Sequence, residues 1–398
     1  MKLDKEYALI GATLIDGNGD APLKDTTIVV RNGVIEEVGD RKSVRLEDSI
    51  QKVDISGCYL MPGLIDSHAH FAGLKLRSVN PSDWVTESES LQAIRAVAEA
   101  RKMLDYGFTT VRSGGGALKF DIDLRKAIEE GTIIGPRIMA CGLRLCRSGA
   151  SEDPVGTVDG VEEIRKAIRK LIGQNVDHIK FVSTGAGMSK NDRPEDVHFS
   201  MEEMRTIMDE SNMVGLKVMC HTTNMKAIRA VVELGVNTIE HCQYAEEDDL
   251  NEELCKKMAE KNIFITPTMA VHFTGTAPAK EIPKYLVNGW KRAMKNGVKI
   301  LLGSDVWGDP ITPYGKQNIA EIKLLVDVLD MTPLQAITSA TKFGAEACGI
   351  SEKIGTIEKG KLADLLIVSK DPTNNIEILL NRENVKYIVK EGNLVVER

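Results

Sequence analysis

Four histidines and one aspartate of this chain stand where their side chains can meet around a metal ion. His68 and His70 are separated by one residue, and on a β-strand residues i and i+2 point to the same side. His221, His241 and Asp305 each come at the end of a separate apolar, strand-like segment. Imidazole nitrogen and carboxylate oxygen suit Zn²⁺, and catalytic zinc sites keep one position open for water. The pattern therefore predicts a metal centre that activates water.

Lys180 lies at an inward position of another such segment, residues 178–182. An ammonium group beside two cations would be repelled and costly to bury. A neutral lysine amine can instead add carbon dioxide and become a carbamate, which is anionic and can bridge two metals. The alternative is a lysine that forms an ordinary ion pair or points outward. Because two adjacent cations need anionic ligands, we favour the bridging carbamate.

Strands and helices alternate over the segment that carries these residues, from about 61 to 350. The strand-like segments after the His68 motif are 109–113, 137–142, 178–182, 216–221, 236–241, 264–269 and 299–305. Apolar residues of 161–172 share one helical face. Helix starts are predicted by the capping boxes Ser200-x-x-Glu203 and Asp159-x-x-Glu162, and by Pro333 after Thr332.

Eight β-α units favour a closed (β/α)8 TIM barrel over an open, doubly wound α/β sheet. No G-x-G-x-x-G follows the first strand to favour the open sheet. The active site of such a barrel forms at the carboxyl ends of its strands, where the five residues and Lys180 stand.

The two ends of the chain read as short strands that belong together. Asn32-Gly33 between β-branched runs indicates a hairpin, and residues 363–368 and 387–396 repeat this character around a Glu-Gly-Asn turn. Neither end has enough strands to bury a sheet face alone. We therefore expect residues 1–60 and 351–398 to form one small β-sandwich domain, with the barrel of residues 61–350 inserted between them.

Composition limits the classes of partner. The net charge of −7 argues against a nucleic-acid scaffold, and 42% hydrophobic with 27% charged residues is typical of soluble globular proteins. Seven scattered cysteines fit reduced thiols. The first residues show no secretory apolar region, and no stretch approaches the length of a membrane span. We expect a soluble cytoplasmic protein that binds a small molecule, with no nucleic acid and no membrane as partner.

Several motifs together resemble the amidohydrolase superfamily of metal-dependent hydrolases, over essentially the whole chain. They are MPGLIDSHAH at 61–70, IK at 179–180, CH at 220–221, IEH at 239–241, GSD at 303–305, the run from 331 to 350 and GTIEKGKLADLLIV at 355–368. The resemblance implies two divalent ions, expected to be Zn²⁺, with Lys180 N6-carboxylated. One ion would be held by His68, His70 and Asp305, and the other by His221 and His241. Carboxylated Lys180 and a hydroxide would bridge them, with Asp305 as catalytic proton shuttle. Relatives are often homo-oligomers.

Within the superfamily the chain looks most like Xaa-Pro dipeptidases and imidazolonepropionase-related amidohydrolases. It departs from the dipeptidase pattern at CRSGASED (146–153), where a histidine is often found, and at Thr222-Thr223-Asn224, where a tyrosine often follows the strand-five histidine. The leading hypothesis is hydrolysis of an amide or peptide bond in a dipeptide or N-acyl amino acid, with a Xaa-Pro dipeptidase as its narrow form. Lactone, carbamate or cyclic-amide hydrolysis is the alternative, followed by a mononuclear deaminase that leaves Lys180 unused.

Residues that follow the predicted strand ends are candidates to line the pocket, although loop packing is an equal alternative for each. Tyr244, His272 and Trp307 follow strands six, seven and eight. A substrate carboxylate would need a cation, and Arg144 or Arg147 stands near strand three.

Two further residues have open roles. Asp66 is expected to orient a ligand histidine or to bond local backbone. His198, in the loop 184–200, is expected to be a lid or surface residue.

Overall fold

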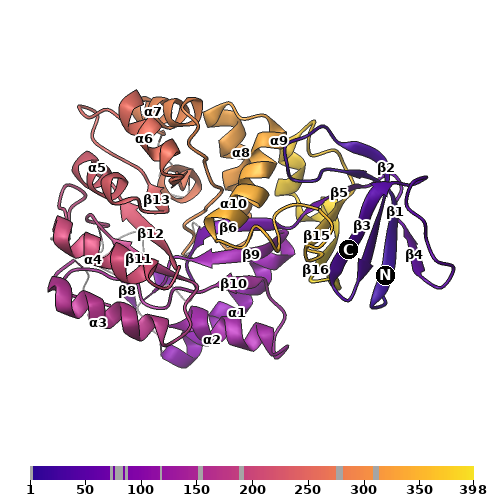
Figure 1. The fold of residues 1–398 in the computed structure, drawn as a ribbon, viewed down its shortest axis with the longest axis horizontal. Helices are drawn as coiled ribbons and strands as arrows, with labels where there is room; N and C mark the ends of the chain where they lie inside the picture. Colours follow the sequence, from indigo (N-terminus) through magenta and orange to yellow (C-terminus); the bar gives the residue numbers. More distant parts are fainter. Residues whose placement is uncertain are drawn as a thin grey trace.

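The computed structural model describes residues 3–71, 75–76, 84–85, 88–116, 119–150, 156–187, 192–274, 281–307 and 313–398. They form an α/β architecture in which a helix-covered set of parallel strands lies beside a mixed β-sheet (Figure 1). Both chain termini lie at the sheet end of the molecule (Figure 1). Among the described helices, none is long and apolar enough to cross a lipid bilayer.

Strands from both ends of the chain share one eight-stranded sheet, as their predicted association requires. Its order is β17-β16-β15-β5-β1-β2-β3, with β4 paired to β1. The first half of β1 pairs with β4 and the second half with β5, so the sheet divides at this strand. The strands are β1 Glu6–Leu14, β2 Leu23–Arg31, β3 Val34–Asp40, β4 Gln51–Asp54, β5 Tyr59–Pro62, β15 Leu365–Val368, β16 Val385–Lys390 and β17 Asn393–Glu397.

Two hairpin turns hold the ends together. Asn32 and Gly33 both have positive φ, as the Asn-Gly signal predicted for the β2–β3 turn. Gly392, in the β16–β17 turn, lies directly against Gly33, and a Cβ added to Gly392 would meet the Gly33 Cα at 2.5 Å. Only glycine permits this contact between turns from opposite ends of the chain.

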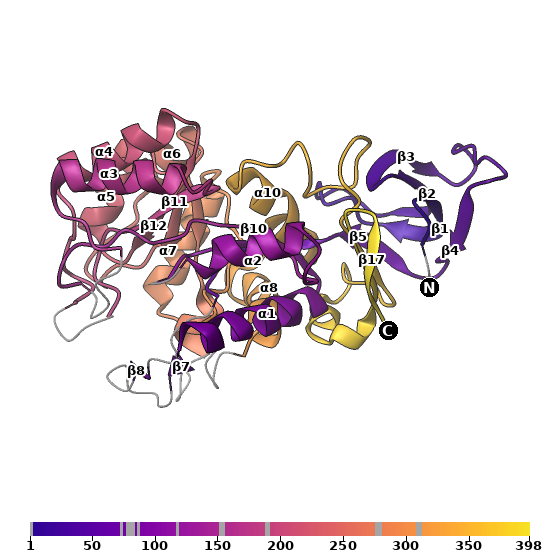
Figure 2. The ribbon, with the colours of Figure 1, turned by 90° about the horizontal axis from the view of Figure 1, so that it is seen from below.

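The second part of the fold consists of parallel strands with helices outside them (Figures 1 and 2). One sheet has the order β10-β9-β6 and the other β11-β12-β13-β14. Their bounds are β6 Leu64–Ala69, β9 Phe108–Ser113, β10 Arg137–Met139, β11 His178–Val182, β12 Lys217–Thr222, β13 Thr238–His241 and β14 Phe264–Thr266; β7 Lys75–Leu76 and β8 Trp84–Val85 form a small separate pair. These strands confirm the placement of seven predicted segments, although β10 and β14 are shorter than predicted.

Isolated parallel bridges continue the pairing beyond these sheets. Leu145 pairs with Phe181 of β11, Ile265 of β14 with Ile300, and Ala69 of β6 with Val306. The predicted strand at 299–305 was wrong as a regular strand. Its carboxyl end departs from extended geometry because Asp305 has a φ of 54°, and the Ser304 N–H donates to the Asp66 side chain.

The helices follow the predicted pattern, and their bounds complete the fold. They are α1 Glu89–Asp105, α2 Phe120–Glu129, α3 Gly160–Ile172, α4 Met201–Asn212, α5 Met225–Leu234, α6 Glu252–Glu260, α7 Lys284–Lys295, α8 Lys316–Leu329, α9 Pro333–Thr338 and α10 Gly344–Ala347, with π-helical turns η2 Ala270–Thr274 and η3 Ser339–Phe343 and 3₁₀ turns η4 Ile376–Leu380 and η5 Arg382–Asn384. The capping box at Ser200 and the helix start at Pro333 are confirmed, and Thr332 also forms a capping box there. The one at Asp159 was wrong, because that carboxylate accepts from Ser148 instead.

Arg137 ties the parallel strands to the mixed sheet. Arg137 lies in β10, and its guanidinium is 2.6 Å from the carboxylate of Asp364, just before β15, and 2.6 Å from that of Glu391, in the β16–β17 turn. The Asp364 side chain is only 4% exposed. Without Arg137 this carboxylate would remain buried and unpaired, which is strongly destabilising.

We therefore expect Arg137→Met to lower the free energy of unfolding by about 3 kcal/mol. Urea unfolding followed by circular dichroism measures the change. The double variant Arg137→Met/Asp364→Asn is expected to recover part of the loss, because the stranded charge is gone. Equal stability of wild type and Arg137→Met would contradict a role for this pair in joining the two parts of the fold.

Candidate metal centre

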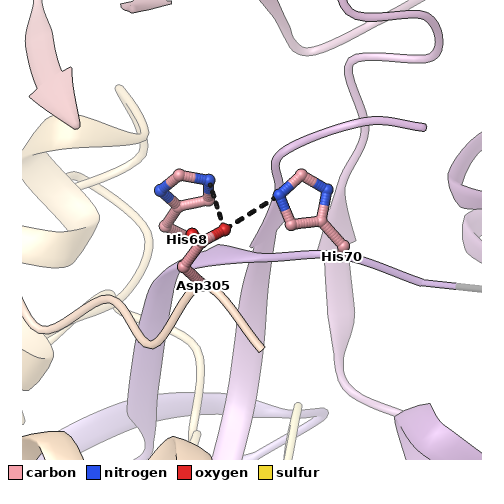
Figure 3. A group of neighbouring side chains, drawn as sticks. All are labelled: His68, His70 and Asp305. Carbon is pink, nitrogen blue, oxygen red and sulfur yellow. Dashed lines mark ion pairs between the residues drawn. The ribbon is translucent and has the colours of Figure 1, made fainter. Parts of the chain in front are cut away.

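Three of the predicted ligands meet at the carboxyl end of β6. The Asp305 Oδ1 atom lies 3.2 Å from His68 Nε2 and 3.0 Å from His70 Nε2. The two imidazoles and the carboxylate converge on one point (Figure 3). All three residues are buried. Their ligand atoms lie close enough to hold one ion.

Three of the histidines are fixed through one ring nitrogen. His68 Nδ1 lies 2.9 Å from Glu240, His70 Nδ1 2.6 Å from the Gly115 carbonyl, and His241 Nδ1 2.7 Å from Thr268 Oγ1. When Nδ1 donates its proton to such a partner, the Nε2 lone pair stays free, as in imidazoles that bind a metal ion.

The imidazoles are also kept neutral. Burial lowers the pKa of His70, His221 and His241, and it lowers the pKa of His68 to about 4. A neutral imidazole is the form that binds a metal ion.

Glu240 is the carboxylate that orients His68, and the sequence interpretation missed it. Its other oxygen lies 3.1 Å from the Arg112 guanidinium, and all three side chains are almost completely buried. Burial raises the pKa of Glu240, but the Arg112 charge and the hydrogen bond from His68 outweigh this effect and lower the pKa to about 2. Glu240 therefore stays ionised and holds the His68 Nδ1 proton.

Asp66 does not orient a ligand ring, so that interpretation was wrong. Its carboxylate accepts from the backbone N–H groups of His68 and Ser304 and from the side chains of Ser304 and Asn318. These bonds hold β6 beside the segment that carries Asp305. The alternative expectation, that Asp66 bonds local backbone, describes the carboxylate correctly.

His221 and Lys180 complete the predicted set. The His221 ring lies 4.4 Å from the His241 ring between centroids, and its Nε2 is buried without a hydrogen-bond partner among the described residues. Lys180 is 2% exposed, and its Nζ lies 3.4 Å from His68 Nε2. A buried ring nitrogen without a hydrogen-bond partner is typical of a metal ligand when no ion is present. These residues therefore fit a second metal position.

Strained backbone surrounds this centre. His241, Thr268 and Asp305 all have φ values between 54° and 69°, in the left-handed region that few non-glycine residues adopt. Gly114 passes so close that an added Cβ would meet His70 Cε1 at 2.6 Å. Such strain persists only where the surrounding structure enforces it, and it gathers at functional sites.

His272 contacts the centre more directly than predicted. Its Nε2 lies 3.0 Å from Asp305 Oδ2, and its side chain is one-third exposed. With His241 and Asp305 it forms a second group whose atoms are close enough for a metal. Glu321 of α8 holds this region, because its carboxylate accepts from the backbone N–H groups of Met269 and Ala270 just before His272.

The other candidate pocket residues have different surroundings. Trp307 stacks on His70 with 3.7 Å between ring centroids, and the Arg144 guanidinium lies 5.4 Å from the Trp307 ring centre. The Tyr244 hydroxyl donates to the Tyr285 carbonyl under α7. Arg147 is part-buried, and its Nε is buried without a hydrogen-bond partner among the described residues. A substrate role for Tyr244, Trp307 or Arg147 stays a prediction.

His198 is neither exposed nor free. Its Nε2 lies 2.9 Å from Asp192, and both side chains are buried. The expectation of a surface residue was wrong, because the backbone of His198 bonds to Ser183 and draws the loop onto the end of β11.

The chain matches the Amidohydrolase family over residues 59–395. The Ochratoxinase of Aspergillus niger is 28% identical over 98% of this chain and 86% of the relative. The Imidazolonepropionase of Clostridium tetani is 23% identical over 96% of this chain and 93% of the relative. Among solved structures, a Xaa-Pro dipeptidase with bound methionine in the active site has a TM-score of 0.86 and 27% identity, covering 99% of this chain and 100% of that chain. These matches confirm the resemblance found in the sequence.

Replacing Glu240 with glutamine should weaken metal binding. A neutral amide oxygen accepts the His68 N–H more weakly than a carboxylate does. We therefore expect the affinity for the metal to fall by about 10- to 100-fold. Metal per chain after dialysis against graded chelator measures it. Glu260→Gln, an exposed glutamate at the end of α6, is the matched control. Unchanged metal retention in Glu240→Gln would exclude an orienting role.

Either His221 or His272 could bind the second metal ion together with His241, and the asparagine variants of the two residues distinguish these alternatives. We expect His221→Asn to lose about one metal ion per chain, since its Nε2 has no other use. His272→Asn should keep its metal content and lose turnover, because it contacts Asp305. Elemental analysis and activity on the same preparations decide, and the reverse pattern would assign the second ion to His272.

Proposed function

The chain belongs to the amidohydrolase family, and from this membership and the geometry of its metal centre we propose that it is a binuclear zinc amidohydrolase that cleaves an amide or peptide bond in a small substrate. It is an enzyme, a hydrolase acting on carbon–nitrogen bonds. The favoured substrates are dipeptides and N-acyl amino acids, with Xaa-Pro dipeptides as the narrow form. The likeness to a Xaa-Pro dipeptidase with bound methionine supports this choice.

One observation carries the proposal. The Asp305 carboxylate is shared, with Oδ1 facing His68 and His70 and Oδ2 facing His272. A carboxylate at the junction of two imidazole groups can serve two metal positions and still reach a proton.

The residues that would hold the ions are His68, His70 and Asp305 for one position and His221 and His241 for the other, with Lys180 between them. When bound, the ions supply a water of lowered pKa and a Lewis acid for the substrate carbonyl oxygen. The protein keeps the imidazoles neutral by burial and fixes their directions through Glu240 and backbone or hydroxyl partners.

Asp305 is the proposed proton shuttle. It would take the proton of the attacking water and pass it to the leaving nitrogen, with His272 on its other oxygen to hold the carboxylate in place. His272 is one-third exposed, so the proposal places the substrate entrance on the side of this oxygen.

Lys180 is the proposed carbamate. No carboxylate forms an ion pair with its amine among the residues that the structure describes, and burial lowers its pKa. A neutral buried amine is the form that adds carbon dioxide, and the resulting anion would offset the charge of two cations.

The proposal includes the closed barrel. The isolated bridges at Leu145, Ile300 and Ala69 support continuous pairing from β10 to β11 and from β14 back to β6. The strand ends that carry the ligands would then meet at one face, as in other barrels. The division into a composite domain of residues 1–60 plus 351–398 and a barrel of residues 61–350 belongs to the same proposal.

Cyclic-amide hydrolysis is the second candidate, because imidazolonepropionases match nearly the whole chain. The same attack on a planar carbonyl serves both reactions, so loop residues decide between them.

Metal content and intact mass test the binuclear centre. We expect about two zinc ions per chain on protein grown with zinc, and a mass gain of one carboxyl group under non-acidic conditions. Lys180→Met should lose the added mass and part of the metal. One ion with no added mass would contradict the proposal and favour the mononuclear deaminase.

Asp305→Asn tests the proton shuttle. The amide can still approach a metal but cannot accept a proton, so we expect retained metal and a fall in turnover of about 100-fold or more. Release of free amino acid from a panel of dipeptides and N-acetyl amino acids measures turnover. Asp327→Asn, an exposed carboxylate of α8, is the control. Full metal content with near-normal turnover would exclude this role for Asp305.

A further inference from the structure

Arg144 is a buried cation that no carboxylate of the described residues neutralises. It is 9% exposed and follows β10, between Leu143 and the bridge at Leu145. Among the described residues no carboxylate forms an ion pair with its guanidinium, and its side chain bonds only the weakly polar thiol of Cys146. An isolated charge in such a place is costly unless something pairs with it.

The position of this charge is set by Trp307. The guanidinium carbon lies 5.4 Å from the centre of the Trp307 ring, which itself stacks on His70 at 3.7 Å with an angle of 17°. Trp307 stands two residues after Asp305. Arg144 is therefore connected through one indole ring to a proposed metal ligand.

The charge and shape of the Arg144 guanidinium indicate which kind of group it binds. Arg144 stands beside a group of side chains that suit cations, so metal ions bound there would repel its charge rather than balance it. Guanidinium presents a planar fork that matches a carboxylate with two parallel hydrogen bonds, and stacking on an aromatic ring fixes the plane of the fork in advance.

We infer that Arg144, oriented by Trp307, binds a carboxylate of the substrate beside the scissile amide and makes this enzyme selective for substrates whose leaving group is a free amino acid. This inference rests on the proposed amide hydrolysis. Arg144 is a specificity-determining residue in this assignment and takes no part in bond cleavage.

The structure favours Arg144 over Arg147, the other arginine of this segment. Arg147 is part-buried, with a buried Nε that has no hydrogen-bond partner among the described residues, and it makes no ring contact with Trp307 there. Arg144 alone of the two combines burial with a contact to the centre.

The first experiment compares two substrates with the same amide bond. N-acetyl-L-phenylalanine carries the carboxylate, and N-acetyl-L-phenylalaninol replaces it with an alcohol; matched methionine and proline pairs extend the series. For the wild type we expect kcat/KM to be about 10- to 100-fold higher on the acids. Arg144→Met should remove that preference by lowering kcat/KM on the acids alone, and Arg144→Lys should keep part of it.

The second experiment needs no turnover. Calorimetry of the zinc-loaded protein compares 3-phenylpropionate with 3-phenylpropanol, neither of which has a bond to hydrolyse. The acid should bind the wild type and lose about 10- to 100-fold in affinity in Arg144→Met. Arg169→Met, an exposed arginine of α3 that pairs with Glu210, is the matched control and should behave as wild type.

Two outcomes overturn the inference. If Arg144→Met lowers kcat/KM equally on the acid and the alcohol, the role of Arg144 is structural. If Arg144→Met binds 3-phenylpropionate as tightly as the wild type does, the metals alone hold the carboxylate. If the wild type cleaves no N-acyl compound, the proposed function fails, and the calorimetric comparison still decides whether Arg144 binds a carboxylate.

Discussion

The Asp305 carboxylate is the interaction on which the rest of the centre depends. It is buried, yet it faces three imidazoles, those of His68, His70 and His272. Burial raises the pKa of a carboxyl group, but the neighbouring histidines outweigh this effect and keep the pKa of Asp305 well below its usual range. An ionised carboxylate therefore stays at a place where a cation is favoured, and the surrounding side chains are arranged to keep it there.

Much of the fold holds this one group and its neighbours in position. The Asp66 carboxylate binds both β6 and Ser304, and Asn318 of α8 closes the same network. Glu321, one helical turn further along α8, fixes the turn that carries His272. A single outer helix, α8, thus supports the backbone on both sides of the centre through the buried side chains of Asn318 and Glu321.

The parts of the site that sequence could not predict are those that depend on register and on broken alternation. Glu240 and His241 are adjacent, so a regular strand would point them to opposite faces. His241 has a φ of 69°, which turns its ring toward His221 while Glu240 reaches His68. The residues Arg112 and Thr268 likewise gain their roles only from strands that lie beside them in space. A local sequence pattern does not predict such contacts, because the two residues of each contact are at least 20 positions apart in the sequence.

By itself, the sequence determined the chemistry and the general plan. The H-x-H pair on one strand, the polar residues at successive strand ends and the glycine-bearing turns predicted the ligand candidates, the α/β alternation and the joining of the two chain ends, because these depend on local periodicity and on residue type. Tertiary structure alone decided which nitrogen each histidine turns inward, that His272 rather than Tyr244 touches Asp305, and that Arg144 lies against Trp307. Those outcomes depend on how separate strands pack side by side, and distance in space is information that a linear pattern does not contain.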